Sequence, residues 1–198
     1  MKSMTASEIP LFPLNTVLFP GGVLPLRIFE PRYLAMVKRC MREGSAFGVA
    51  LIQSGRETDA QVVACSVGTL AQIVDFDQLP DKLLGITTRG TQRFRSLNAR
   101  VRDDGLHVSQ VELLPIDPVI ALPEEFVHYA KLLEEALPQM GDFFKHLQPQ
   151  YDDAGWVSGR LAEVLPIPLE EKQRLLEMDD PIARLHVLQP LIRGTAGN

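Results

Sequence analysis

The sequence predicts an α+β protein in which a β-rich part, residues 1–116, is followed by a helical part, residues 117–198. Short apolar runs separated by glycine and proline fill the first half, a pattern typical of a small β-barrel. In the second half, apolar residues recur at helical spacing instead. The pattern changes at Pro115-Ile116-Asp117-Pro118, so we expect the two subdomains to meet there.

Two apolar runs, residues 9–14 and 24–28, open the β-rich part. Both contain proline, which edge strands tolerate because proline has no N–H to donate to a central ladder. Between them, residues 19–22 (Phe-Pro-Gly-Gly) predict a tight turn of type II, with Gly21 at the position of positive φ. Pro31 suits the first turn of a helix that we expect to end at Gly44. The predicted buried face of this helix consists of Tyr33, Leu34, Val37 and Met41.

Further strands are expected where strand-forming residues gather, over residues 47–52, 68–76, 84–88, 93–95 and 106–114. Leu84, Ile86 and Thr88 alternate with the period of two of a half-buried strand. Residues 103–105 (Asp-Asp-Gly) have the composition of a hairpin turn. Several short strands with one inserted helix predict a partly closed barrel.

Two sets of apolar residues in the second half fall at helical spacing: Phe126, Ala130, Leu133 and Leu137, then Val157, Leu161, Val164 and Leu165. Two more helices are expected, over residues 169–178 and 182–192. Asp180 and Pro181 suit the cap and the first turn of the last one. The second half therefore predicts a helical bundle.

The formal net charge of −5 is unevenly distributed. Residues 1–116 carry 13 Lys and Arg against 11 Asp and Glu, whereas residues 117–198 carry 7 against 14. Nucleic-acid affinity depends on clustered cations that release counterions. The balance of charge therefore weakens nucleic acid as a partner.

Cys40 and Cys65 are the only cysteines, and they lack the paired spacing of zinc ligands. Two thiols in a chain of this size favour a reducing compartment over a disulfide framework. No apolar run approaches the roughly 20 residues that a membrane span needs. We expect a cytoplasmic protein with no bound metal and no membrane contact.

No catalytic motif is found in the sequence, which has neither a G-x-S-x-G elbow nor an H-E-x-x-H helix. Residues 85–92 have the two glycines of a phosphate-binding loop, but Thr91 and Gln92 replace its lysine and hydroxyl residue. We interpret this segment as a hairpin turn. The acidic pairs at residues 152–153 and 170–171 precede helical runs, where carboxylates favour the positive end of the helix dipole. We predict no enzymatic activity and no cofactor, with a hydrolase assembled from distant residues as a lower-ranked alternative.

Five arginines form a local basic stripe on strand-like segments: Arg89, Arg93, Arg95, Arg100 and Arg102. Stacking platforms for nucleic acid usually interleave several aromatic side chains, and here only Phe94 is interleaved. A solvated face is therefore the favoured interpretation. An RNA-binding surface is the alternative.

Residues 9–33, IPLFPLNTVLFPGGVLPLRIFEPRY, resemble the opening of the N-terminal domain of Lon proteases. The resemblance continues at residues 90–94 (GTQRF) and at residues 169–177 (LEEKQRLLE). It extends from Ile9 to about Ile192.

This resemblance implies a PUA-like β-barrel with one inserted helix, followed by a C-terminal helical bundle. It also implies a stand-alone substrate-binding domain that recognises unfolded or extended protein segments, without the ATPase and peptidase parts of Lon. An RNA-binding PUA-like module is the alternative function. The implied partners are such segments and a Lon-type protease, whereas the client and the oligomeric state stay open.

We predict that a ligand groove lies on the β-rich part or between the two parts, with edge-strand pairing as a further mode of binding. Aromatic residues and arginine are enriched at interface anchors. The predicted contacts in the opening motif are Phe29, Pro31, Arg32 and Tyr33. Arg93 and Phe94 of the basic stripe are predicted to join them.

Overall fold

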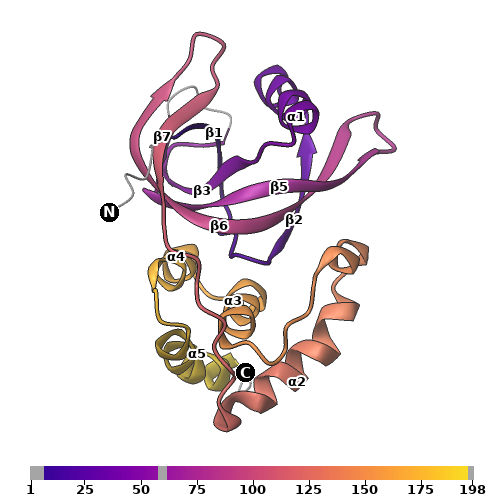
Figure 1. Cartoon of the computed structure of the whole chain (residues 1–198). Coiled ribbons are helices and arrows are strands. Elements are labelled where there is room, and N and C mark those ends of the chain that lie inside the picture. The colour runs from indigo at the N-terminus through magenta and orange to yellow at the C-terminus, as the bar shows by residue number, and fades with distance from the viewer. Residues whose placement is uncertain (1–6, 58–61, 196–198) are drawn as a thin grey trace.

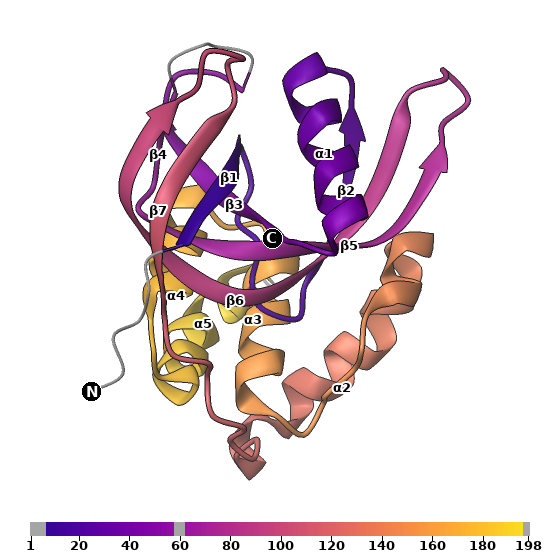
Figure 2. The ribbon, with the colours of Figure 1, turned by 45° about the horizontal axis from the view of Figure 1, so that its top comes forward.

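The computed structural model describes residues 7–57 and 62–195, and Figure 1 shows a β-rich part packed against a helical part. The helix α1 lies on the side of the strands that faces away from the other helices (Figures 1 and 2). The elements of the β-rich part are β1 (Ser7–Leu14), β2 (Val23–Ile28), α1 (Pro31–Glu43), β3 (Phe47–Ser54), β4 (Val63–Ala64), β5 (Val67–Gln78), β6 (Leu84–Val101) and β7 (His107–Leu113).

The helical part follows β7 and an extended connection. Its elements are the 3-10 turn η1 (Glu124–Phe126), α2 (Val127–Ala136), η2 (Leu137–Gln139), η3 (Asp142–His146), α3 (Ala154–Val164), α4 (Leu169–Glu177) and α5 (Pro181–Thr195). The backbone N–H of Ile182 donates to Asp180 Oδ1 at 2.8 Å, so the predicted cap of the last helix is confirmed. The order of elements confirms the α+β class.

The strand pairings of the β-rich part close into a ring. The order β1-β7-β6-β5-β3 returns to β1, because β1 also pairs with β3. The strand β1 changes partner at Leu11: its first half is antiparallel to β7, and its second half is parallel to β3. Pro10 and Pro13 therefore each lie in a half with one partner, which is why a strand inside the ring tolerates both. The PUA-like description of this ring stays a prediction.

The helix α1 begins at Pro31 and is followed by Gly44 in the left-handed conformation, as predicted. Its buried face consists of Tyr33, Met36, Val37 and Cys40. The prediction was wrong for Met41, which is exposed, and Leu34 is only half-buried. The correct stripe follows the i, i+3, i+4, i+7 spacing of one helix face from Tyr33 onward.

Residues 85–92 lie inside the continuous strand β6, so the prediction of a hairpin turn there was wrong. The glycine at position 90 serves close packing: a Cβ on Gly90 would lie 2.3 Å from the carbonyl oxygen of Phe19. The chain reverses between β5 and β6 at residues 79–83, where Lys82 N–H donates to Leu79 O. The predicted turn at residues 103–105 is confirmed by a hydrogen bond from Gly105 N–H to Arg102 O.

Two large apolar clusters make up most of the core. One lies within the β-rich part and packs α1 against the strands through residues such as Phe12, Val37 and Phe47. The other fills the helical part and extends into the β-rich part through Phe19 and Val67. The two parts thus share apolar packing, and their division at residues 116 and 117 stays a prediction about domain organisation.

Candidate functional site

Two charged residues of α3, Arg160 and Glu163, bind the turn at residues 19–22 through hydrogen bonds. We call this arrangement the turn clamp. Gly22 N–H donates to Phe19 O at 3.0 Å, and Gly21 has φ 77°, as a type II turn requires. The fully buried Arg160 donates to Pro20 O at 3.2 and 3.3 Å. It also donates to Glu163 Oε2 at 2.7 Å.

The carboxylate of Glu163 completes the turn clamp by accepting from Phe19 N–H at 3.0 Å. Burial raises the pKa of Glu163, while the Arg160 guanidinium and the Phe19 N–H act in the opposite direction. The hydrogen bonds to both of its oxygens stabilise the ionised form against this cost of burial. The conformation of the turn and the position of α3 depend on each other.

A second polar junction ties β6 to the ends of α4 and α5. Arg93 is buried and donates to Leu176 O at 3.0 Å and to Asp117 Oδ1 at 2.8 Å. Arg184, also buried, donates to Leu175 O at 2.9 Å and lies 3.7 Å from Asp117 Oδ2. The Asp117 carboxylate thus lies beside two buried guanidinium groups, and Arg93 also pairs with Asp179 Oδ1 at 2.9 Å.

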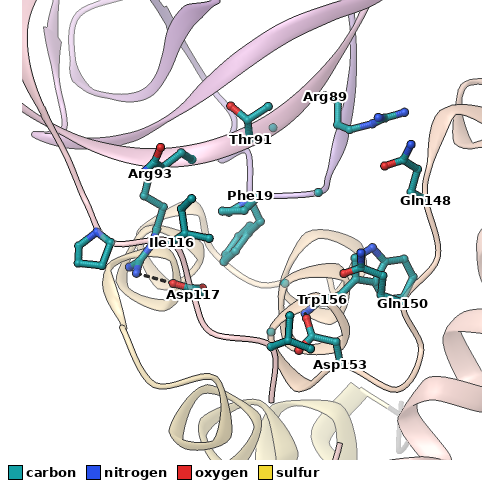
Figure 3. A pocket seen from close by; sticks show the side chains of 18 of the residues that line it. Phe19, Arg89, Thr91, Arg93, Ile116, Asp117, Gln148, Gln150, Asp153 and Trp156 are labelled. Atoms are coloured by element: carbon teal, nitrogen blue, oxygen red, sulfur yellow. Dashed lines mark hydrogen bonds and ion pairs between the residues drawn. The ribbon is translucent and has the colours of Figure 1, made fainter. Parts of the chain in front are cut away.

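A cleft of about 330 Å³ opens beside these two junctions, between β6 and the start of α3. We call it the interface cleft. In Figure 3, Arg89, Thr91 and Arg93 of β6 lie on one side of it, and Gln150, Asp153 and Trp156 lie on the other. The connection after β7 contributes Ile116 and Val119, whose side chains are 77% and 87% exposed.

Two buried donors at the interface cleft have no hydrogen-bond acceptor within the described residues. They are the indole Nε1 of Trp156, a residue only 4% exposed, and the Nε of Arg89. The Arg89 guanidinium makes one hydrogen bond, from Nη2 to His146 O at 2.7 Å. In contrast, the Asp153 carboxylate is fully used, because it accepts from Trp156 N–H at 2.9 Å and Ile120 N–H at 3.0 Å.

A second hollow, of about 310 Å³, lies beside β2 and the start of α1. We call it the Phe29 groove, after an aromatic side chain that is 59% exposed. Pro25, Leu26 and Tyr33 also line it. Among the described strands, β2 pairs with β6 alone, so its other edge has no strand partner.

The residues predicted in the opening motif gather around the Phe29 groove. Phe29 and Tyr33 line it, and Pro31 is exposed at the adjacent helix start. Tyr33 is nevertheless buried and stacks on Phe12 with 3.9 Å between ring centroids. Burial raises the pKa of Tyr33 to about 12. Arg32 is held by Glu30 Oε2 at 2.8 Å and by the carbonyl of Gly105 at 3.0 Å.

The two residues predicted on β6 have different outcomes. Arg93 does line the interface cleft, but its hydrogen bonds go to the protein itself. Phe94 is completely buried in a small cluster with Leu11 and Val111. The prediction that its ring contacts a ligand is therefore corrected: this side chain fills space that Gly48 and Gly68 leave free.

The arginine stripe does not form a continuous basic face. Arg93 is buried, Arg100 pairs with Glu8 at 2.8 Å, and Arg102 lies 3.5 Å from Asp104. This arrangement does not support the RNA-binding alternative, because clustered unpaired cations are what nucleic acid requires.

The sequence reasoning missed Trp156, Arg160 and Glu163. A signal was present, since two charged residues at i, i+3 interrupt the otherwise apolar helix from Val157 to Leu165. A charged side chain on the buried face of a helix is costly unless it has a hydrogen-bond or ion-pair partner. The partner of Arg160 is the turn at residues 19–22, and the bonded residue, Pro20, lies 140 residues away in the chain.

Within residues 7–57 and 62–195, no group of three or more His, Cys, Asp or Glu side chains is placed to hold a metal ion. No helix in that part of the chain combines the length and apolar character needed to cross a membrane.

Comparison with known proteins gives a consistent family. The model of the ATP-dependent protease La (LON) substrate-binding domain matches residues 8–193. The Lon protease of Anaeromyxobacter dehalogenans is 26% identical over 96% of this chain, and Lon protease 2 of Myxococcus xanthus is 28% identical over 93%. The aligned regions cover 24% and 23% of those proteins, so the chain spans about a quarter of the length of the relatives it matches.

Solved structures agree with the sequence relatives. A Lon N-terminal domain protein from Xanthomonas campestris is 41% identical and superposes with a TM-score of 0.76, covering 93% of this chain and 98% of that one. The N-terminal domain of the Mycobacterium avium complex Lon protease has the same fold, with a TM-score of 0.63 at 19% identity and with 93% and 97% of the two chains covered. The fold is therefore that of Lon N-terminal domains, and the chain belongs to the LON substrate-binding domain family.

Proposed function

We propose that this chain is a non-catalytic recognition module that holds unfolded or extended segments of other proteins. The observation that carries the proposal is the match of the LON substrate-binding domain over residues 8–193. A family defined by substrate binding, matched over nearly the whole chain, favours a binding role over a catalytic one. The PUA-like barrel implied by the resemblance is part of the same proposal, and the closed ring of pairings is compatible with it.

The surface beside β2 supports this proposal with a mode of binding. An extended segment can add to an open strand edge through main-chain hydrogen bonds, while pockets beside the edge accept alternate side chains. Residues of β2, whose second edge pairs with no described strand, line the Phe29 groove. Phe29 and Pro31 are the exposed residues of the opening motif that we propose as contacts there.

Buried hydrogen bonds between the two parts support the second surface, the interface cleft, as a binding site. Arg93 and Arg160 join the helices to the β-rich part through buried hydrogen bonds, and Arg184 joins α5 to α4. Preformed surfaces bind more tightly because less conformational entropy is lost on association. We propose a Lon-type protease as a partner that receives the held segment, because the sequence relatives are Lon proteases.

A direct test uses one protein in two states. A fluorescently labelled protein, permanently unfolded by reduction and alkylation, is titrated with the chain, and its folded form serves as the control. We expect binding of the unfolded form with a Kd of about 50 μM or tighter and no binding of the folded form. Failure to bind several unrelated unfolded proteins would count decisively against the proposal.

A further inference from the structure

The buried indole N–H of Trp156 points to a missing acceptor at the interface cleft. Buried indole N–H groups usually find a hydrogen-bond partner, and leaving a buried donor without one is destabilising. The Nε1 of Trp156 would lie only 3.7 Å from a Cβ placed on Gly21. This edge of the indole ring therefore faces the turn at residues 19–22, which lines the cleft. Gln148 and Gln150 at the same cleft are exposed, and exposed side chains reorient within nanoseconds, so a bound segment can displace them.

Arg89 supplies the second observation, because it is the cation of the cleft without a counter-charge. Arg93 and Arg184 share the carboxylate of Asp117. Within the described residues, Arg89 has no ion-pair partner, its Nε is unpartnered, and one nitrogen is fixed by His146 O. Carboxylates are the natural acceptors for a guanidinium held in this way, since charge-assisted pairs are the stronger hydrogen bonds.

The rim of the cleft adds apolar surface. Ile116 and Val119 belong to the connection between the two parts and are among the most exposed apolar side chains. Figure 3 shows Ile116 across the cleft from Arg89. A segment that contacts both Arg89 and Ile116 matches the cleft when it has an acidic group at one end and an apolar side chain at the other.

We infer that the interface cleft binds extended protein segments in which a carboxylate lies next to apolar residues. The carboxylate pairs with Arg89, a main-chain carbonyl accepts from Trp156 Nε1–H, and the apolar side chain packs on Ile116 and Val119. The carboxylate can belong to Asp or Glu or to a free C-terminus. This inference rests on the proposed function and names the class of segment that one of its two surfaces selects.

Trp156 is the single tryptophan of the chain, so its fluorescence reports directly on the cleft. The probes are four tryptophan-free peptides of one apolar sequence, carrying either Asp or Asn at the centre and either a free or an amidated C-terminus. We expect the peptides with a carboxylate to bind about tenfold more tightly than the Asn amide and to shift the tryptophan emission. The Asp amide and the Asn acid distinguish a side-chain carboxylate from a terminal one.

Matched variants locate the interaction. Arg89→Gln is expected to lower the affinity for the best carboxylate peptide about tenfold and to leave the affinity for the Asn amide unchanged. Arg95→Gln removes the same charge from an exposed position of the same strand and should change neither affinity. Trp156→Phe, followed by anisotropy of a labelled peptide, is expected to weaken binding about fivefold, with thermal melting as a check that the variant is folded.

The outcomes separate the inference from the proposed function. If the chain binds unfolded protein but does not distinguish carboxylate from amide peptides, or if Arg89→Gln behaves like Arg95→Gln, the inference is overturned and the proposed function stands. Peptide binding that leaves the tryptophan emission unchanged would also overturn the inference and leave the proposed function standing. If the chain binds neither unfolded protein nor any peptide, both fail together.

Discussion

Two consecutive turns of α3 meet the β-rich part in contrasting ways. Trp156 and Arg160 are four residues apart, so they lie on the same face of the helix. Arg160 is completely buried, and its guanidinium is bonded to Pro20 O and Glu163. Trp156 is almost as buried, yet its indole N–H has no acceptor among the described residues.

The difference shows how a structural contact and a candidate binding contact can be distinguished on one helix. A buried charge is stable only when its hydrogen bonds are complete, and the turn clamp meets this requirement within the protein. The interface cleft does not, because Trp156 and Arg89 retain unused donors. Complete polar pairing indicates a fixed joint, and incomplete pairing beside a cleft indicates a place for another molecule.

The largest expected effect comes from breaking the turn clamp. Arg160→Leu removes the fully buried cation and leaves the Glu163 carboxylate without its main partner, so we expect a loss of about 3 kcal/mol in the free energy of unfolding. Urea denaturation measures it. Arg174→Leu is the control, because its ion pair with Glu171 is exposed and such pairs contribute about 0.5 kcal/mol. Equal losses in the two variants would contradict a structural role for the clamp.

A smaller effect is expected from a substitution in β6, the strand that is hydrogen-bonded to the turn at residues 19–22. In Gly90→Ala the new Cβ would lie 2.3 Å from the carbonyl oxygen of Phe19, and backbone cannot move aside as a side chain can. Overpacking of this kind costs about 2 kcal/mol. Gly85→Ala is the matched control on the same strand, since its nearest neighbour is the flexible Leu79 side chain at 2.9 Å. Denaturation curves should show the larger loss for Gly90→Ala.

The buried imidazole of His107 extends this comparison to the effect of pH on stability. The Nε2 of His107 also lacks a partner in the part of the chain that the structure describes, and burial together with the charge of Arg32 lowers the pKa of this imidazole below 6.5. The folded protein therefore keeps His107 neutral where the unfolded chain binds a proton. The unfolded state binds more protons as the pH falls below about 6.5, so stability decreases there and is unaffected above it.

The variant His107→Leu tests this explanation. Its loss of stability between pH about 7.5 and about 5.5 should be smaller than that of the unsubstituted chain, because one proton uptake on unfolding is removed. Urea denaturation at the two values gives the comparison. An unchanged difference would show that His107 does not contribute to the pH dependence.

The smallest expected effect concerns the Phe29 groove. Phe29→Ala should change the free energy of unfolding by less than about 0.5 kcal/mol, because the ring is largely exposed. It should weaken binding of an unfolded protein about fivefold, as expected for an aromatic interface anchor. Phe76→Ala is the control, since both rings are 59% exposed and Phe76 lies outside the groove. Equal weakening by both substitutions would argue against a specific site at Phe29.

Local signals in the sequence predicted most of the elements. Pro31 and Gly44 mark the two ends of α1, and the Phe-Pro-Gly-Gly turn forms where it was predicted. These predictions succeeded because proline and glycine act through their own backbone angles. The phosphate-loop-like segment was misread because Gly90 serves close packing against Phe19, a neighbour 71 residues away, rather than a turn.

The candidate site was predicted only in part. Phe29 and Tyr33 lie at one hollow because they belong to a single continuous motif, and their role as ligand contacts stays a prediction. The interface cleft was foreseen only as a position between the two parts. Its defining residues, Arg89 and Trp156, come from segments that no local pattern connects.

The sequence by itself determined the order of elements, the absence of recognisable catalytic motifs and the resemblance to Lon N-terminal domains. Only the tertiary structure decided which arginine of β6 is neutralised in the interior, which has no counter-charge among the described residues and which is exposed: Arg93, Arg89 and Arg95, respectively. The physical reason is that side-chain burial and pairing depend on what packs opposite a strand. For Arg93 the partners are the ends of helices more than 80 residues away.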